Sequence, residues 1–248
     1  MTEAIVPLLS LIALEVILGI DNIIFISILA DKLPEHQRDK LRYWGIGLAM
    51  LMRIGLLAAI AWILKLDKTL FTMFDVDFSG KGLILIAGGL FLIYKSTKEI
   101  HEKVDEKGQE EKEMKKSAAK SFQGVLLQII MIDLVFSFDS ILTAVGMTNG
   151  VEGALYIMIT AVIISVLIMM QFAVPVGTFV NNHPSIQILG LSFLILIGFM
   201  LITESAHLSN ALIFGGHVTP VQKGYLYFAI SFSLFVEFLN MKVDKKKK

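Results

Sequence analysis

The stretch LEVILGIDNIIF, residues 14–25, sets two acids into an otherwise apolar segment, and IDLVFSFDSIL, residues 132–142, repeats the arrangement. In each copy five residues separate the acids, and a small polar residue follows the second acid. The acids are Glu15 and Asp21 in the first copy and Asp133 and Asp139 in the second, followed by Asn22 and Ser140. The surrounding apolar runs, 4–30 and 121–147, are long enough to cross a bilayer, which needs about 20 residues.

Four acids at this depth need partners. An ionised side chain inside the membrane costs roughly 2.5–3.5 kcal/mol on insertion scales, so four carboxylates cost on the order of 10–14 kcal/mol. Arg53 is the one basic residue that we expect at the same depth. About three negative charges are then left over, and protons or a bound cation must balance them.

The composition is that of a polytopic membrane protein. The chain has 248 residues, of which 55% are hydrophobic, and its mean hydropathy is +0.73. It has no cysteine, which excludes disulfides and thiolate metal sites. We find no Ser/His/Asp set, nucleotide loop or metal-hydrolase motif, so we expect neither an enzyme, an organic cofactor nor a nucleic-acid partner.

Hydropathy predicts an all-α fold with seven transmembrane helices. The expected spans are 4–30, 44–64, 78–97, 121–147, 153–175, 185–206 and 224–241. The third is the weakest, because its purely apolar run covers only 82–94. Lysines at its ends, Lys81 and Lys95, can extend to the membrane surface.

Basic residues support this topology. With the N-terminus outside, 17 of the 22 Lys and Arg residues fall in cytoplasmic segments and 4 in external ones. Positive charge gathers on the cytoplasmic side of membrane proteins, so we expect the N-terminus outside and the C-terminus inside. Without the third span, the basic segment 95–120 would lie outside, against this rule. The bilayer is therefore an expected partner, and homo-oligomer formation is left open.

The two halves repeat each other at an offset of 118 residues, which pairs the acids and pairs Arg53 with Gln171. Three spans per half is an odd number, so we expect two inverted three-helix repeats plus a seventh helix. The expected divisions are repeat 1 (1–98), a charged cytoplasmic linker (99–120), repeat 2 (121–206) and the region of the seventh span (207–248).

The chemistry of the acid motifs favours a metal site. Carboxylate, amide, hydroxyl and carbonyl oxygens suit Mn²⁺, Mg²⁺ or Ca²⁺ better than zinc or copper. The predicted ligands are Glu15, Asp21, Asn22, Asp133, Asp139 and Ser140, with Arg53, Gln171, Glu204 and Glu237 as accessory candidates. We also expect the helices to unwind between the acids, at Gly19 and Ser137, which would free backbone carbonyls as ligands.

Arg53 has two interpretations: it pairs with an acid for structure, or it releases metal by competing for the acids. Without metal, carboxylates clustered in a medium of low dielectric constant bind protons more readily. Exchange of protons for metal is therefore a natural mechanism.

These motifs resemble the two signature stretches of the TerC family of integral membrane proteins. KGYLYFA, residues 223–229, and FVEFLN, residues 235–240, are similar to its C-terminal signature. The resemblance covers essentially the whole chain and implies a multi-pass protein of the bacterial inner membrane. Some members are linked to manganese export, others to tellurite resistance, and a plant member to thylakoid biogenesis. Manganese and the export direction come from this resemblance alone.

Two functions from different classes follow. The first is a secondary transporter that exports divalent cations, most notably Mn²⁺, through a midplane carboxylate site in exchange for protons. The second is a membrane scaffold or biogenesis factor in which the acids form a structural or regulatory ion site. A seven-helix retinal protein is disfavoured, because its Schiff base needs a lysine in the last span and residues 224–241 contain none. The repeated acids would also have no role in such a protein.

Overall fold

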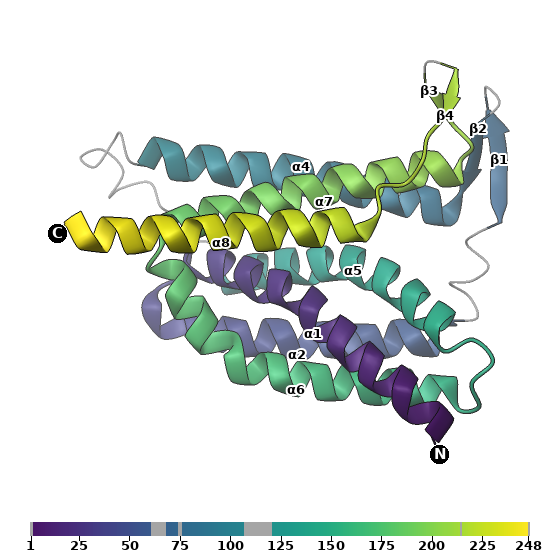
Figure 1. Ribbon diagram of the computed structural model, residues 1–248, viewed down its shortest axis with the longest axis horizontal. Helices are drawn as coiled ribbons and strands as arrows, with labels where there is room; N and C mark the ends of the chain where they lie inside the picture. Colours follow the sequence, from purple (N-terminus) through teal and green to yellow (C-terminus); the bar gives the residue numbers. More distant parts are fainter. Residues whose placement is uncertain (1, 61–67, 74–75, 107–120, 214, 248) are drawn as a thin grey trace. The chain divides into compact units, whose positions relative to one another are not determined.

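The computed structural model describes residues 2–60, 68–73, 76–106, 121–213 and 215–247. At Thr2, Glu3, Asp21, Glu106, Asp139, Ile213 and residues 244–247 it describes the backbone alone. The described residues form seven helices: α1 (Thr2–Ala30), α2 (Glu35–Ala58), α4 (Gly80–Glu106), α5 (Phe122–Met147), α6 (Ala154–Asn181), α7 (Pro184–Leu208) and α8 (Lys223–Lys247) (Figure 1).

Six of these helices are long and apolar enough to cross a membrane. They are α1, α2, α5, α6, α7 and α8, within the part of the chain that the structure describes. This agrees with the prediction of an all-helical, polytopic membrane protein. The helix that falls outside this set is α4, which contains the span that the sequence already marked as the weakest.

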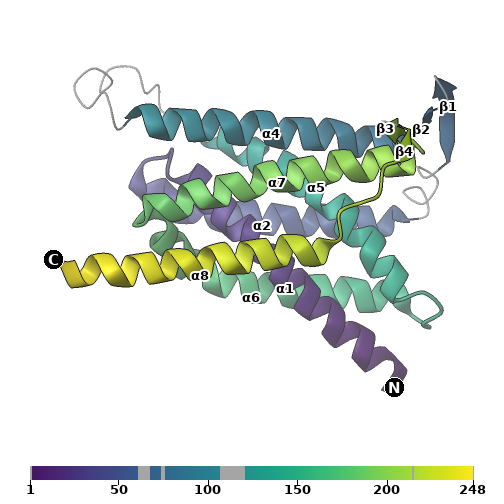
Figure 2. The same ribbon diagram turned by 45° about the horizontal axis from the view of Figure 1, so that its top comes forward.

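The first compact unit contains α1, α2, α5 and α6. Helix α1 packs most extensively against α6, and α2 packs against both α5 and α6 (Figure 2). Glycine permits the close approach of α1 to α6, since a side chain at Gly19 would meet the thioether of Met169. Each acid motif therefore lies on a helix of this unit, and α2 packs beside both of these helices.

The second unit contains α4, α7 and α8. Helices α4 and α7 run antiparallel along their whole length. At one end the Ser205 hydroxyl donates to the carbonyl of Gly82 over 2.7 Å, and at the other Lys103 Nζ donates to Gln187 Oε1 over 2.5 Å. The α7–α8 contact is apolar, with Phe193, Leu226 and Ile230 at its centre.

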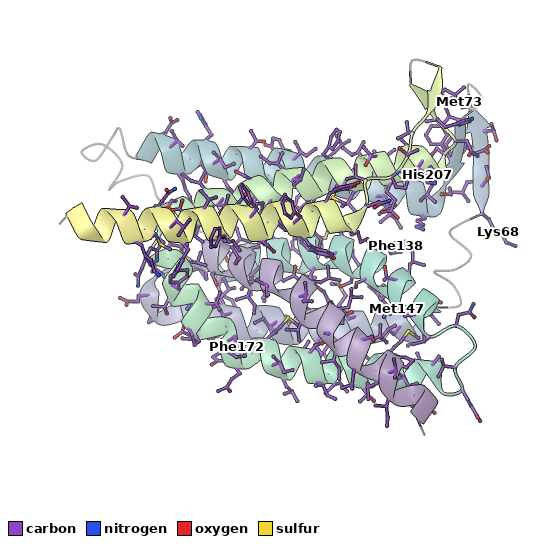
Figure 3. All side chains as sticks on the ribbon, in the orientation of Figure 1. Lys68, Met73, Phe138, Met147, Phe172 and His207 are labelled. Atoms are coloured by element: carbon purple, nitrogen blue, oxygen red, sulfur yellow. The ribbon has the colours of Figure 1, made fainter. Side chains whose placement is uncertain are left out.

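Two short antiparallel hairpins belong to the second unit. They are β1 (Thr69–Met73) with β2 (Val76–Ser79), and β3 (Leu212–Ile213) with β4 (Gly216–His217). The amide of Asp77 donates to the carbonyl of Ser209 over 3.0 Å, which links the first hairpin to the end of α7. Met73 and His207 both lie at this end of the unit (Figure 3). Hydropathy did not indicate the hairpins.

The two largest departures from the predicted spans are at the start of α2 and at the end of α4. Helix α2 begins at Glu35, directly after Pro34, nine residues before the predicted start at 44. The first turns of α2 are polar, so a search for apolar runs finds the helix only where its apolar part begins. Helix α4 runs on to Glu106 and buries Glu99, which pairs with Lys95 over 2.9 Å. The predicted linker 99–120 thus begins as helix, and residues 107–120 lie outside the described part of the chain.

Candidate functional site

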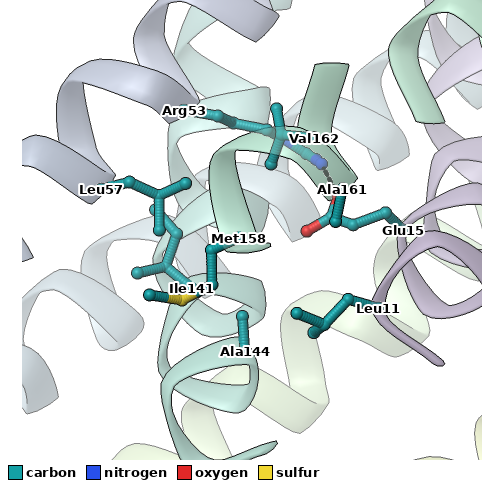
Figure 4. Close-up of a pocket in the computed structure, with 9 residues that line it drawn as sticks. All are labelled: Leu11, Glu15, Arg53, Leu57, Ile141, Ala144, Met158, Ala161 and Val162. Atoms are coloured by element: carbon teal, nitrogen blue, oxygen red, sulfur yellow. Dashed lines mark hydrogen bonds and ion pairs between the residues drawn. The ribbon is translucent and has the colours of Figure 1, made fainter. Parts of the chain in front are cut away.

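One arginine joins the two acid motifs. Arg53, on α2, donates from Nη1 to Oε2 of Glu15 on α1 and from Nη2 to Oδ1 of Asp133 on α5, over 3.2 Å. Figure 4 shows the guanidinium directed at the Glu15 carboxylate. All three residues are buried, with 3% of Arg53, 3% of Glu15 and 5% of Asp133 exposed. The first acids of both sequence motifs therefore converge on a single cation.

Two further side chains complete the hydrogen bonds of this cluster. The Ser137 hydroxyl accepts from Arg53 Nε over 3.0 Å and donates to Oδ2 of Asp133 over 3.0 Å. The Asn22 amide donates to Oδ1 of Asp133 over 3.2 Å. Asp133 is thus bonded through both carboxylate oxygens and Arg53 through three nitrogens. We call Glu15, Asn22, Arg53, Asp133 and Ser137 the arginine cluster.

The arginine cluster is electrostatically unbalanced. Two carboxylates face one guanidinium, so the three side chains together carry one excess negative charge when both acids are ionised. Breaking a buried ion pair by removing one partner typically costs about 3–5 kcal/mol, because a charge is left without compensation. Removing Arg53 would therefore leave two buried carboxylates without the cation that they share.

A small cavity lies on each side of Arg53 along α2. The first is lined by Glu15, Leu57 and residues of α5 and α6 that include Ala144 and Met158 (Figure 4). The second is lined by Asn22, Asp133 and residues toward the start of α2, among them Ile46 and Met50. Each has room for roughly one water molecule. The guanidinium thus separates two spaces that each contain one of its carboxylate partners.

The predicted site residues divide into three groups. Glu15, Asn22, Asp133 and Arg53 come together, whereas Ser140 is buried nearby with its hydroxyl donated to the carbonyl of Ser137 over 3.2 Å. Asp21 and Asp139 belong to α1 and α5, and their side chains lie outside the described part of the structure. The third group holds the remaining candidates. Gln171 belongs to the same unit as the cluster but is exposed on α6, and Glu204 and Glu237 are half-buried on α7 and α8 of the second unit.

The predicted unwinding between the acids is wrong. Helices α1 and α5 continue through Gly19 and Ser137 without interruption. Gly19 serves close packing against Met169 instead, and Ser137 satisfies Asp133 and Arg53 from within an intact helix. Because side chains already supply the polar contacts, no carbonyl has to be freed to form them.

A second buried arginine, Arg42, lies outside the predicted spans, between 4–30 and 44–64. It lies in α2, pairs with Asp39 and covers Gly177 of α6, where a side chain would collide with its guanidinium. The spacing of the two arginines could have revealed it. Arg42 precedes Arg53 by eleven residues, about three helical turns, so both arginines lie on nearly the same face of one helix. Ser137 was also missed as a hydrogen-bonding member of the cluster.

The donor set fits a hard cation. The carboxylates of Glu15 and Asp133, the amide of Asn22 and the hydroxyls of Ser137 and Ser140 offer oxygen, the ligand atom that Mg²⁺, Ca²⁺ and Mn²⁺ prefer. Among the described side chains, no three His, Cys, Asp or Glu residues are close enough to hold a metal together. A fuller acidic set would have to include Asp21 or Asp139, whose side chains lie outside that description.

Comparison with known proteins places these features in a family. The family model described as "Integral membrane protein TerC family" matches residues 1–248. A UPF0053 protein of Haemophilus influenzae is 47% identical over 246 residues, covering 99% of this chain and 97% of its own.

Two relatives from Escherichia coli K12 differ in length. The UPF0053 inner membrane protein YgdQ is 48% identical, covering 96% of this chain and 92% of its own. The UPF0053 inner membrane protein YoaE is 46% identical over 94% of this chain, but the match spans only 42% of the relative. No solved structure matches the chain.

Proposed function

Because the chain belongs to the TerC family of integral membrane proteins, we propose that it is a secondary transporter that exports divalent cations, above all Mn²⁺. The observation that carries the proposal is the convergence of Glu15 and Asp133, from two copies of one motif, on a single buried cation. A position where two carboxylates of different helices already hold one cation is suited to hold another. The names of the relatives YgdQ and YoaE support an inner-membrane location.

Oxygen donors support manganese or a chemically similar ion as the substrate. Mn²⁺, Mg²⁺ and Ca²⁺ prefer carboxylate and carbonyl oxygens, whereas zinc and copper sites usually recruit nitrogen or sulfur. Glu15, Asp133 and Asn22 supply the first kind of ligand. Asp21, Asp139 and Ser140 extend this set in our proposal, and protons move against the metal to balance its charge.

The packing of the second unit supports α4 as a seventh membrane span. Helix α4 lies along α7 from the Gly82–Ser205 contact to the Lys103–Gln187 contact. Since α7 is itself long and apolar enough to span, a helix packed along its whole length crosses the same bilayer. Adding α4 to the six apolar helices gives seven spans, with the N-terminus outside and the C-terminus inside.

Reciprocal contacts support two inverted repeats. The repeat pairs α1 with α5 and α2 with α6, so the α1–α6 packing corresponds to the α5–α2 packing, and both occur. In the second unit, a side chain on Gly89 would meet the carbonyl of Gly198, and one on Gly198 would meet the carbonyl of Gly89. Such mutual contacts are what a two-fold relation between α4 and α7 requires. Inverted-repeat transporters bind substrate near the midplane, between their halves.

The test is Mn²⁺ flux into proteoliposomes, with an enclosed pH dye and with Mg²⁺, Ca²⁺ and Zn²⁺ as competitors. We expect saturable Mn²⁺ flux with opposite proton movement in the wild type. Flux should fall by at least about 100-fold in Asp133→Asn, Asp21→Asn and Asp139→Asn, as expected for the loss of an essential carboxylate ligand. Glu152→Gln, in the exposed turn before α6, is the matched control and should transport normally.

The outcome also separates the second function. Folded wild-type protein that carries no Mn²⁺ would contradict the transporter and favour a scaffold whose acids form a structural ion site. Equal flux in the wild type and the three aspartate variants would place the transport path elsewhere in the protein.

A further inference from the structure

We infer that Arg53 is an internal counter-cation, which occupies the cation site while metal is absent and must leave Glu15 and Asp133 before metal can bind. This inference rests on the proposed transport function and assigns a step of its cycle to one residue. The sequence left open whether Arg53 is purely structural or competes with metal. The geometry favours competition, because the guanidinium contacts the carboxylate oxygens that a bound cation would need.

The contacts of Arg53 match those of a bound cation. Its Nη1 and Nη2 reach acids on two different helices, and all three groups are buried. Arg53 bridges the corresponding acids of both motifs, as a metal ion shared by the two copies would. Arginine keeps its charge under all physiological conditions, so Arg53 is always available as a cation beside the two acids.

Charge explains why a carrier needs this device. Without metal and without Arg53, Glu15 and Asp133 would present two uncompensated charges inside the membrane, where each is expensive. A carrier in that state cannot easily rearrange to return its empty site to the other side. With Arg53 in place, the empty site retains one excess charge instead of two, so the empty carrier can rearrange.

Space for the exchange lies on both sides of the guanidinium. The cavity bordered by Leu57 and the one bordered by Met50 both reach Arg53 from opposite directions along α2. Ser137, which accepts from Nε, can keep the base of the side chain in place while its outer nitrogens move away from the acids. Movement of one side chain can thus exchange an internal cation for an external one.

If Arg53 is a counter-cation, its loss should affect two kinds of transport differently. Mn²⁺/Mn²⁺ exchange never requires the empty site to rearrange, whereas net Mn²⁺ flux requires it in every cycle. Replacing Arg53 should therefore impair net flux and spare exchange. A residue needed only for folding would affect both equally.

The experiment compares wild type, Arg53→Gln and Arg38→Gln in proteoliposomes loaded either with Mn²⁺ or with buffer alone. For Arg53→Gln we expect net flux to fall at least about tenfold, exchange to stay within about threefold, and Mn²⁺ to bind about tenfold more tightly because its competitor is gone. Arg38→Gln removes the same charge near the start of α2, where Arg38 pairs with Asp31 away from the cluster. It should match the wild type in all three measurements.

A second measurement covers the case in which Arg53→Gln folds poorly. Mn²⁺ should raise the melting temperature of detergent-solubilised Arg53→Gln, or of the milder Arg53→Lys, by more than it raises that of the wild type. Equal Mn²⁺-induced shifts, or equal losses of net flux and exchange in a folded variant, would overturn the inference while leaving transport intact. Absence of both flux and exchange in the wild type would instead refute the proposed function.

Discussion

At the scale of single residues, two serines one turn apart on α5 have different tasks. Ser137 bonds Arg53 and Asp133, both charged, whereas the hydroxyl of Ser140 donates to a carbonyl of its own helix. Hydrogen bonds to charged groups contribute about 1.5–3 kcal/mol, and neutral ones about 1 kcal/mol or less. We expect Ser137→Ala to lower the free energy of unfolding of the metal-free protein by about 1.5–3 kcal/mol and Ser140→Ala by less than about 1 kcal/mol.

The pair of serine variants also tests the ligand assignment. If Ser140 is a metal ligand, Ser140→Ala should weaken Mn²⁺ binding measured by titration calorimetry while leaving the melting temperature of the metal-free protein almost unchanged. Equal destabilisation by both alanine variants would show that the contacts of Ser137 to the charged groups contribute nothing beyond an ordinary hydrogen bond.

At the scale of helices, two glycines determine how closely α4 and α7 can pack. A side chain at Gly89 would meet the carbonyl of Gly198 and also Ile202, and backbone cannot move aside as a flexible side chain can. Overpacking of this kind costs about 1–3 kcal/mol. We therefore expect Gly89→Ala to lower the melting temperature of the purified protein in a fluorescence-detected unfolding experiment, in proportion to a loss of about 1–3 kcal/mol.

Gly224→Ala provides the control for this prediction within the same unit. At Gly224, in the first turn of α8, an added side chain meets none of the described atoms within 4 Å. Its effect should lie within about 0.5 kcal/mol, as for other surface substitutions. Comparable destabilisation by the two variants would mean that loss of glycine, not the approach of α4 to α7, lowers stability.

Periodicity and charge predicted much of this structure, and their failures have physical causes. The acids Glu15 and Asp133 could be identified because charge is rare in long apolar segments. The sequence could not show that both acids contact Arg53, since this depends on which faces of α1, α2 and α5 meet. Arg42 lies outside the predicted spans because polar residues begin α2, although tertiary contacts with α6 bury it. Gly19 was read as a break because the sequence alone does not show that Met169 packs against it.

At the scale of the whole molecule, α4 determines on which side of the membrane every later segment lies. If α4 crosses the bilayer, the turn before α6 is external and the turn between α6 and α7 is cytoplasmic. If it does not, these two turns exchange sides, while the turn between α1 and α2 stays cytoplasmic. The charge distribution favours the first arrangement, because it keeps the basic segment 95–120 inside.

The absence of native cysteine makes this prediction directly testable, because a single introduced cysteine is then the only thiol. We expect a membrane-impermeant maleimide, added to intact cells, to label Glu152→Cys, and to label Glu35→Cys and Asn182→Cys only after permeabilisation; all three positions are exposed. Labelling of Asn182→Cys, but of neither Glu152→Cys nor Glu35→Cys, in intact cells would mean that α4 does not span. Labelling of Glu35→Cys in intact cells would mean that the orientation is reversed. That result would also place the cavity next to Leu57 on the cytoplasmic side of Arg53 and the cavity next to Met50 on its external side.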